Sequence, residues 1–410
     1  MSRAALMNNY GTPPVTFVRG EGAELWDDRG RRYLDFLCGL AVTGLGHAHP
    51  AVTEAVASQA STLIHTSNLF ANEPTAEVVE TLDRLIRSGP GGDAESGRIL
   101  FQNSGAEAVE AALKLARKHS GRGRHAVVTA YGSFHGRTLA ALAATGQPEK
   151  HEPFAPMPDG FRHVPFDDID ALVAALDPSV GAVLLESVQG EGGVVPAGDG
   201  YLQAVREVCD ERGILLALDE IQTGLARTGR WFGYQHAGIQ PDIVTMAKAL
   251  GNGVPVGAVW ARAEVAAAFG PGDHGSTFAG QPLALAAVRA VLTELQAMDA
   301  PAVAGRLGAA LRDLLESLDG VGTVRGRGLL LAAELSEEAR AGRSAKDIAS
   351  ACLEGGLVVN GVTPTALRLA PPFVVSAEQL AEGCAILAAA LESRRSGPPT
   401  RIDPTPDERS

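Results

Sequence analysis

Apolar and polar positions along the chain predict a sheet of mostly parallel strands that alternate with longer helices. Short apolar runs bounded by turn residues are typical of buried strands, whereas apolar residues at every third or fourth position indicate helices. The expected strands are Arg98–Gln102, His125–Thr129, Gly181–Glu186, Ile214–Asp219, Ile243–Met246 and Gly257–Ala261, and the expected helices include Glu107–Lys118, Tyr201–Arg212, Pro282–Met298 and Val303–Leu318.

The pattern changes near Gly320, where a smaller α+β unit is expected to begin. Short apolar runs follow, the first at Leu329–Leu335, and a last helix is expected at Ala377–Ser393. The fold class is therefore α/β, with a large domain and a small one. The predicted parts are an N-terminal segment that joins the small domain (1–60), a large domain (61–300), a C-terminal small domain (301–395) and a disordered tail rich in Pro, Ser and charge (396–410).

Composition narrows the class of protein. A chain of 410 residues can bury a large core, and a net charge of −13 argues against nucleic acid or an anionic membrane surface as the main partner. Apolar runs long enough for a membrane span and a signal-peptide pattern are both absent from the sequence. Four widely spaced cysteines indicate neither a zinc site nor a disulfide framework, so we expect no metal and a cytoplasmic location.

Lysine is rare in this chain, with five among 35 basic residues, and Lys248 has the most unusual setting. It lies in the apolar run Ile243–Gly253, where a buried ammonium is costly. A lysine with a depressed pKa is what Schiff-base chemistry with a carbonyl compound requires. The alternative is a side chain whose stem packs while its ammonium reaches water. The local sequence does not decide between the two.

Two other segments place polar groups at the ends of predicted strands. Ser104-Gly105-Ala106-Glu107 fits a capping box, and such a helix start can bind phosphate, although a capped helix without a ligand explains the motif more simply. Asp219 ends an apolar strand, at the edge where open α/β sheets bind ligands. A P-loop ATPase is excluded, because its motif needs a glycine directly before a lysine and no lysine in this chain follows a glycine. A dinucleotide site also lacks support, because no G-x-G-x-x-G lies between a predicted strand and a predicted helix.

Together these groups match the needs of one cofactor. Pyridoxal phosphate requires a lysine for its aldehyde, an acid for its pyridine nitrogen and a cradle for its phosphate. Lys248, Asp219 and the helix start at Ser104 would supply them, and Phe134, which follows a predicted strand, could cover the ring.

Over about Asn8 to Leu391 the chain resembles the class III aminotransferases of fold type I, and within them the acetylornithine aminotransferases. Each motif is weak alone, but their order and spacing are specific. The resemblance implies the fold type I architecture of pyridoxal-phosphate-dependent transferases. The matching segments are NNYGTPP, LGHAHPAV, HTSNLF, NSGAEAVEAALKLAR, FHGRT, QGEGGV, DEIQTG, RTG, AKALGNG, HGSTFAGQP and RLAPP.

The resemblance implies a role for each cofactor-binding residue. Lys248 would bond to the cofactor aldehyde and carry a proton, and Asp219 would contact the pyridine nitrogen. Gln222 would contact the ring hydroxyl, and Phe134 would stack on the ring. The phosphate would be held by Ser104, Gly105 and Ala106 together with Thr277 of the neighbouring subunit, so the resemblance implies a homodimer with shared sites.

The resemblance also implies the substrates. Arg137 would bind a substrate carboxylate near Ser276, and Arg368 would bind the second carboxylate of the oxo acid. Glu191 would pair with Arg368 when a substrate lacks that carboxylate. The implied reaction transfers the terminal amino group of N2-acetyl-L-ornithine to 2-oxoglutarate, giving N-acetyl-L-glutamate 5-semialdehyde and L-glutamate in arginine biosynthesis. Ornithine, succinyl-diaminopimelate, 4-aminobutyrate and diaminobutyrate remain alternative donors, and a non-catalytic binding protein is the alternative from another class.

Five further residues have a simpler interpretation. His47 and His49 could suggest a metal pair, but no acid or thiol cluster accompanies them, so we expect structural roles. Arg325 and Arg327 are expected in a turn with solvated charges, with a role along a substrate channel as the alternative. Glu186 is expected to accept hydrogen bonds beside the site and not to take part in catalysis.

Overall fold

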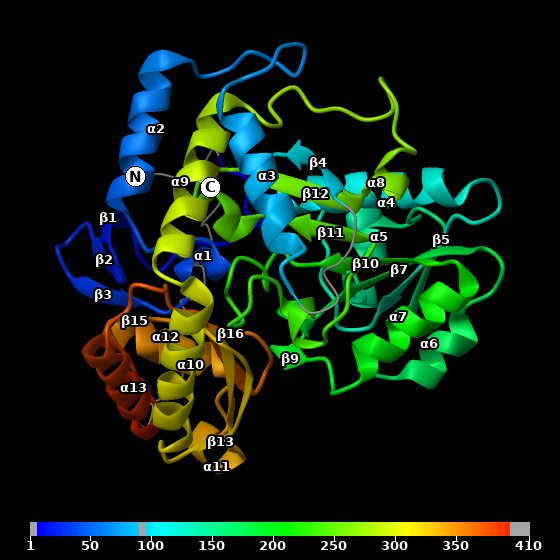
Figure 1. Cartoon of the computed structure of the whole chain (residues 1–410). Helices are drawn as coiled ribbons and strands as arrows, with labels where there is room; N and C mark the ends of the chain where they lie inside the picture. The colour runs from blue at the N-terminus through cyan, green and yellow to red at the C-terminus, as the bar shows by residue number, and fades with distance from the viewer. Residues whose placement is uncertain (1–5, 90–95, 394–410) are drawn as a thin grey trace, which may run out of the picture.

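A computed structural model describes residues 6–89 and 96–393 of the chain. The predicted disordered tail at 396–410 lies outside the described residues. The fold is α/β, as predicted: a seven-stranded sheet is covered by helices, and a smaller region with its own sheet packs below it in Figure 1. Among the described residues, no helix is long and apolar enough to cross a membrane.

The seven-stranded sheet contains all six predicted strands, with bounds within one residue of those expected. Six strands run in the same direction, and only β12 is antiparallel to its two neighbours. The sequence analysis missed β6, a partly exposed edge strand without an apolar run. In sheet order the strands are β4 (Gly97–Gln102), β12 (Gly257–Arg262), β11 (Ile243–Met246), β10 (Leu215–Asp219), β7 (Val180–Glu186), β5 (Ala126–Ala130) and β6 (Phe161–Val164).

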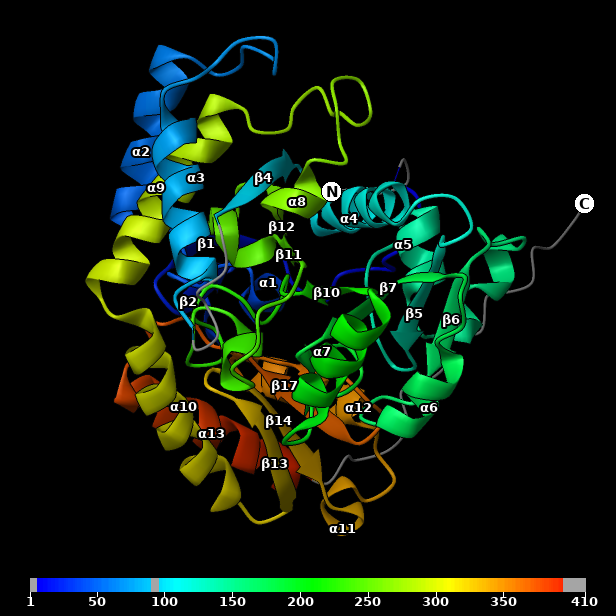
Figure 2. The same cartoon turned by 45° about the vertical axis from the view of Figure 1, so that its right-hand side comes forward.

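The inner strands β5, β7, β10 and β11 are buried on both faces, which explains why they consist mostly of apolar residues. Along β10, Leu216 and Leu218 join one core, whereas Ala217 joins another on the opposite face. Figure 2 shows the helices on the two sides. The second face carries α4 (Gly105–Ser120), α5 (Leu139–Ala144) and α8 (Ala263–Ala266), and the first carries α2 (Pro50–Thr62), α3 (Pro74–Ile86), α6 (Ile169–Ala175), α7 (Tyr201–Arg212) and α9 (Pro282–Ala297).

The smaller region has a core of its own, built from the two ends of the chain. Its four-stranded antiparallel sheet has the order β13-β14-β17-β16, and β15 pairs with the N-terminal strands. Its elements are β1 (Phe17–Glu21), β2 (Glu24–Asp27), β3 (Arg32–Asp35), α10 (Ala300–Glu316), β13 (Val321–Arg327), β14 (Leu330–Leu335), α11 (Glu337–Arg340), α12 (Ala345–Gly355), β15 (Leu357–Val358), β16 (Asn360–Gly361), β17 (Ala366–Leu369) and α13 (Ala377–Glu392).

The turn predicted at Arg325 and Arg327 is wrong, because both residues lie in strand β13. Arg325 pairs with Ala332 and Arg327 with Leu330 across an antiparallel ladder. The hairpin turn comes directly after them, at Gly328 and Leu329, and Gly326 lies within the strand. A side chain on Gly326 would collide with the carbonyl of Leu330.

Between the two regions lie a helical turn, α1 (Cys38–Ala41), and a small hairpin formed by β8 (Val188–Gln189) and β9 (Val195–Pro196). Ala41, Val188 and Val194 pack there against residues of the C-terminal sheet. The hairpin follows directly after β7, so its tip lies beside the carboxyl edge of the large sheet.

Candidate active site

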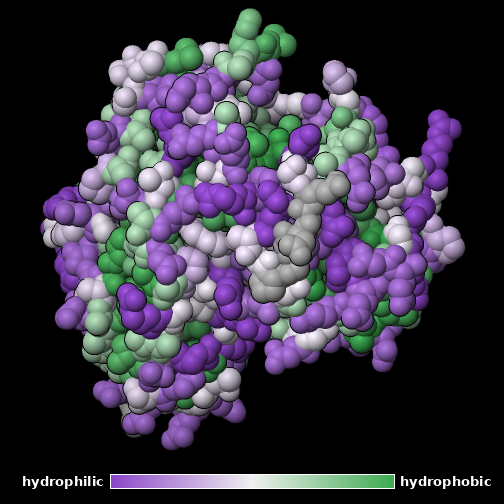
Figure 3. All heavy atoms as spheres, viewed as in Figure 1, coloured by the Kyte–Doolittle hydropathy of each residue, from purple (hydrophilic) through white to green (hydrophobic). Residues whose placement is uncertain are grey.

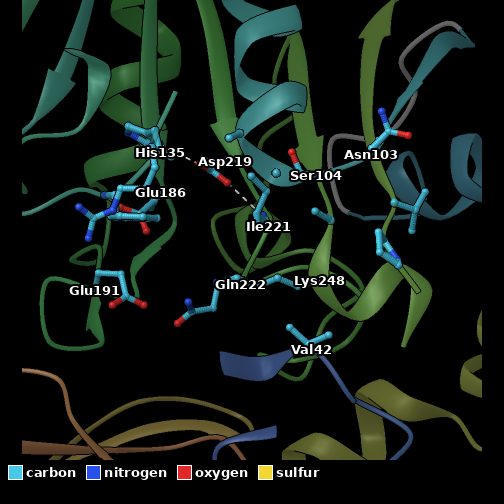
Figure 4. Close-up of a pocket in the computed structure, with 18 of the residues that line it drawn as sticks. Val42, Asn103, Ser104, His135, Glu186, Glu191, Asp219, Ile221, Gln222 and Lys248 are labelled. Atoms are coloured by element: carbon cyan, nitrogen blue, oxygen red, sulfur yellow. Dashed lines mark hydrogen bonds and ion pairs between the residues drawn. The ribbon is translucent and has the colours of Figure 1, made fainter. Parts of the chain in front are cut away.

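A cavity of about 400 Å³ opens at the carboxyl edge of the large sheet (Figure 4). The parallel strands β4, β7, β10 and β11 all end there, so residues far apart in sequence meet at one place. Nine of the predicted site residues line this cavity: Ser104, Gly105, Ala106, Phe134, Arg137, Glu191, Asp219, Gln222 and Lys248.

Lys248 follows β11 and begins a short 3-10 helix, Lys248–Gly251. Its backbone is left-handed, with φ of +48°, a strained conformation for a residue with a side chain. Burial, followed by the nearby Arg368 guanidinium, lowers the pKa of the Lys248 amine to about 8. The amine is therefore neutral in a substantial fraction of molecules near neutral pH, as a nucleophilic lysine requires.

Asp219 ends β10 and is held from two sides. Its Oδ2 lies 2.8 Å from Nδ1 of His135, and its Oδ1 accepts a hydrogen bond from the Ile221 amide at 3.1 Å. Burial would lower the pKa of His135, but the hydrogen bond with Asp219 raises it above its ordinary value. The His135 ring therefore holds the Asp219 carboxylate in place at the cavity.

The predicted cap of α4 is confirmed, because Ser104 Oγ accepts a hydrogen bond from the Glu107 amide. The second half of the predicted capping box is wrong. The Glu107 carboxylate accepts from the amide and the side chain of Asn103, both less than 3 Å away, and not from the Ser104 amide. The first amides of α4 have no partner within the helix and, at Gly105 and Ala106, border the cavity.

Glu186 lines the cavity and accepts hydrogen bonds from the backbone around it. Burial, with a smaller contribution from Asp219, raises the pKa of its carboxyl to about 7. The same carboxyl accepts hydrogen bonds from the amides of Phe134 and Gly190. It therefore fixes the segment that carries Phe134, in line with the structural role expected of it.

Two arginines lie at different depths. Arg137 is exposed at the rim, with its guanidinium 5.4 Å from the centre of the Phe134 ring. Arg368 is only 1% exposed and lies behind the cavity wall, where it donates to Glu191 at 2.5 Å and to Gln222 at 3.1 Å. Burial would raise the pKa of Glu191, but Arg368 holds it below its ordinary value.

Ser276 and Thr277 do not line the cavity of this chain. Ser276 accepts a hydrogen bond from Asn103 at 2.7 Å, which connects its segment to the start of α4. Thr277 is exposed and is not among the residues that line the cavity. The single chain thus brings together the predicted site residues except Thr277, with Ser276 and Arg368 in contact with residues that line it.

The sequence analysis missed several residues of the cavity wall, among them Val42, Asn103, His135 and Ile221 (Figure 4). His135 is adjacent to Phe134 in the sequence, but its partner Asp219 lies 84 residues away, so no spacing pattern could have paired them. Asn103 directly precedes the capping motif, and this position was the only indication in the sequence that it belongs to the site.

His47 and His49 have protein partners outside the cavity. His47 Nε2 lies 2.7 Å from the Asp35 carboxylate, and His49 Nε2 lies 4.0 Å from Glu294. Asp35 also accepts hydrogen bonds from the amides of Leu37 and Cys38. The His47–Asp35 pair thus orders the chain where β3 passes into α1.

Comparison with known proteins gives one consistent family. The model of aminotransferase class-III matches residues 6–391. The acetylornithine aminotransferase of Mycobacterium tuberculosis H37Rv is 48% identical, over 97% of this chain and 96% of that protein. A crystal structure of N-acetylornithine aminotransferase from Stenotrophomonas maltophilia K279a is 38% identical, with a TM-score of 0.80 over 94% of this chain and 97% of that chain. An ornithine aminotransferase structure from Toxoplasma gondii, with PLP at partial occupancy, is 35% identical, with a TM-score of 0.87 over 95% and 92% of the two chains.

Proposed function

The chain belongs to the class III aminotransferases, and we propose that it transfers the terminal amino group of N2-acetyl-L-ornithine to 2-oxoglutarate. The products are N-acetyl-L-glutamate 5-semialdehyde and L-glutamate, a step of arginine biosynthesis. The proposal rests mainly on one cavity. Lys248 and Asp219 line it, the exposed Arg137 lies at its rim, and the buried Arg368 lies behind its wall. The names of the relatives from Mycobacterium tuberculosis and Stenotrophomonas maltophilia support this donor over ornithine.

The residues of the cavity fit pyridoxal 5'-phosphate, the cofactor of this family. Ser104, Gly105 and Ala106 would hold its phosphate at the start of α4, where the helix dipole favours an anion. Asp219 would bind the protonated pyridine nitrogen, and Phe134 would cover the ring. When bound, the cofactor withdraws electrons from the carbon that bears the amino group and stores that group between the two half-reactions.

Lys248 and its neighbours would then handle the proton. The Lys248 amine, with its pKa lowered to about 8 by burial, is suited both to bond the cofactor aldehyde and to take a proton from the substrate carbon. His135 would hold the Asp219 carboxylate in a fixed orientation. Gln222, which in this structure accepts from Arg368, would also contact the ring hydroxyl.

Arg137 and Arg368 would bind the carboxylates of the substrates. Arg137 at the rim would bind the carboxylate of acetylornithine near Ser276, as a planar fork suits a carboxylate. Arg368 would bind the second carboxylate of 2-oxoglutarate, and its Nη2 atom lacks a hydrogen-bond partner although it is buried. Glu191 would cover Arg368 during the donor half-reaction and leave it during the acceptor half-reaction.

We further propose a homodimer in which Thr277 reaches the phosphate of the neighbouring site. An exposed apolar patch supports it: Leu63, Ile64, Leu69 and Phe70 follow α2, and the patch continues to Phe278. Hydrophobic residues gather at the top of Figure 3, over the segment between α2 and α3.

The four buried, free cysteines fit the proposed cytoplasmic location.

A screen of single half-reactions tests the donor. The cofactor-loaded enzyme is mixed with one amine at a time, and loss of its visible absorbance is followed. N2-acetylornithine should give a higher kcat/KM than ornithine, succinyl-diaminopimelate, 4-aminobutyrate or diaminobutyrate. A higher value for any of the others would reassign the donor, and a protein without visible absorbance would favour the non-catalytic alternative.

A further inference from the structure

Two arginines of the C-terminal sheet lie in one row and hold the same hairpin. Arg325 on β13 and Arg368 on β17 both pair with Ala332 of the strand between them, so they occupy one face of the sheet. Both side chains reach the segment 190–194, the turn between β8 and β9. This turn carries Glu191, the residue that pairs with Arg368.

The two guanidiniums hold opposite ends of the turn. Arg368 donates to the carbonyl of Gly190 at 3.4 Å and to the Glu191 carboxylate. Arg325 donates through Nε to the carbonyl of Gly193 at 2.7 Å. Its other contact is the Glu334 carboxylate on β14, at 2.7 Å.

The carboxylates that pair with the two arginines lie on different kinds of backbone, a strand and a turn. Glu334 lies on a strand, so it is a fixed partner for Arg325. Glu191 lies in a turn, so its backbone can carry it away from Arg368 when another carboxylate arrives, although its side chain is no more exposed than that of Glu334 (30% against 33%). Arg368 then changes its partner while Arg325 keeps both of its contacts.

The Gly193 end of the turn is the rigid end. Gly193 has φ of +112° and Val194 has φ of +54°, conformations that tertiary contacts must maintain. Val194 is fully buried between the two regions. A side chain on Gly193 would come within 2.9 Å of Thr363 and 3.0 Å of the Arg325 guanidinium, so the small region closes directly over this residue.

We propose that Arg325 is a positioning residue for substrate selection: it fixes the Gly193 end of the turn so that Glu191 alone moves on and off Arg368. This proposal rests on the proposed function, because it assumes that Arg368 binds the second carboxylate of the acceptor. Without Arg325, the turn has more conformations, and fewer of them place Glu191 on Arg368. Arg368 is then uncovered more often, and dicarboxylates gain over a donor that has a single free carboxylate.

Binding of glutarate to the cofactor-loaded enzyme, measured by calorimetry, tests the role of Arg325. Glutarate has two carboxylates and no amino or keto group, so it binds without reacting. Glu191→Ala removes the competitor for Arg368 and should tighten binding by about tenfold, the order of one charge-assisted hydrogen bond. Arg325→Met should tighten binding by about threefold, and it should add nothing once Glu191→Ala is present.

Arg312→Met is the matched control. Arg312 on α10 donates to the carbonyls of Val324 and Gly326, so it supports the same strand β13 without touching the turn. Its removal should leave glutarate binding unchanged. Equal effects of Arg312→Met and Arg325→Met would overturn the proposal, since they would reflect a loosened strand.

The double variant separates the remaining explanations. If Arg325→Met changes glutarate binding equally with and without Glu191, the lost charge alone is responsible and the positioning role is overturned. If binding depends on Arg368 and Glu191 but not on Arg325, only the role of Arg325 fails. If Arg368→Met leaves glutarate binding intact, the second carboxylate site of the proposed function fails, whatever Arg325 does.

Discussion

Lys248 combines an unusual backbone conformation with an unusual charge state. Its position after β11 turns the side chain into the cavity, and burial brings the pKa of its amine to about 8. An amine with the ordinary lysine pKa of 10.5 would be neutral in about three molecules in ten thousand at pH 7, against about one in ten for Lys248. Burial in this fold therefore leaves the Lys248 amine neutral far more often than the amine of a surface lysine.

The rate at which the cofactor-free enzyme captures pyridoxal 5'-phosphate should follow this titration. Only the neutral amine attacks an aldehyde, so the rate should rise with pH and level off above about pH 8. Stopped-flow absorbance over pH 6 to 10 measures it, with Lys248→Ala as the control that never forms the chromophore. A midpoint near pH 10 would show that the amine is not perturbed.

The sequence analysis predicted residues that the structure brings together in one cavity, but not the contacts that hold them there. The isolation of Lys248 among apolar residues and the strand end at Asp219 are local signals. The contact of Asp219 with His135 is tertiary, and it depends on β5 and β10 lying on either side of β7. The order of strands in a sheet cannot be predicted from a short stretch of sequence, so nothing in the sequence indicated that His135 contacts Asp219.

At the level of elements, the N-cap residue that precedes α4 has two tasks. Ser104 caps the helix, and it also lies at the cavity where a phosphate would bind. The capping motif predicts the first task from sequence alone. The second depends on neighbours: Gly257 of β12 lies against the backbone of Ser104, where a side chain would collide with the Ser104 carbonyl.

Replacing Ser104 by alanine should therefore have two separable effects. Loss of the cap should lower the stability of the cofactor-free protein by about 1 kcal/mol, measured by urea unfolding. Loss of the hydroxyl should also weaken pyridoxal 5'-phosphate binding by about tenfold or more. Ser376→Ala removes a comparable cap on α13, far from the cavity, and should match the first effect without the second. Equal cofactor affinity in both variants would contradict a role of Ser104 in phosphate binding.

The elements differed in how well their sequence predicted them. Strands buried on both faces and helices with an alanine-rich face, such as α4, were found because burial imposes a strong pattern. β6 was missed because an edge strand is under less constraint. The turn predicted at Arg325 and Arg327 begins one residue later, at Gly328. Gly326 packs closely within the strand instead, and only tertiary contacts distinguish that use of glycine from a turn.

For the whole molecule, the segment that carries Thr277 is continuous with the exposed apolar patch. The Asn68 side chain donates to the carbonyls of Ser276 and Ala279, which ties the segment after α2 to the segment before α9. Leu69 and Phe70 are 86% and 69% exposed beside it. Such a patch is costly on a monomer, and a two-fold axis through it would bring Thr277 to the other subunit.

Mixed dimers test whether each site uses Thr277 from the other subunit. Lys248→Ala and Thr277→Glu should each inactivate the homodimer, the second by repelling the phosphate. In a hybrid, one site then carries both defects and the other carries neither, so an equal mixture after subunit exchange should regain about a quarter of wild-type activity. Thr323→Glu, an exposed position on β13, should remain active and serve as the control for added charge. If Thr277 served its own subunit, every site in the hybrid would carry one defect, and mixing would restore no activity.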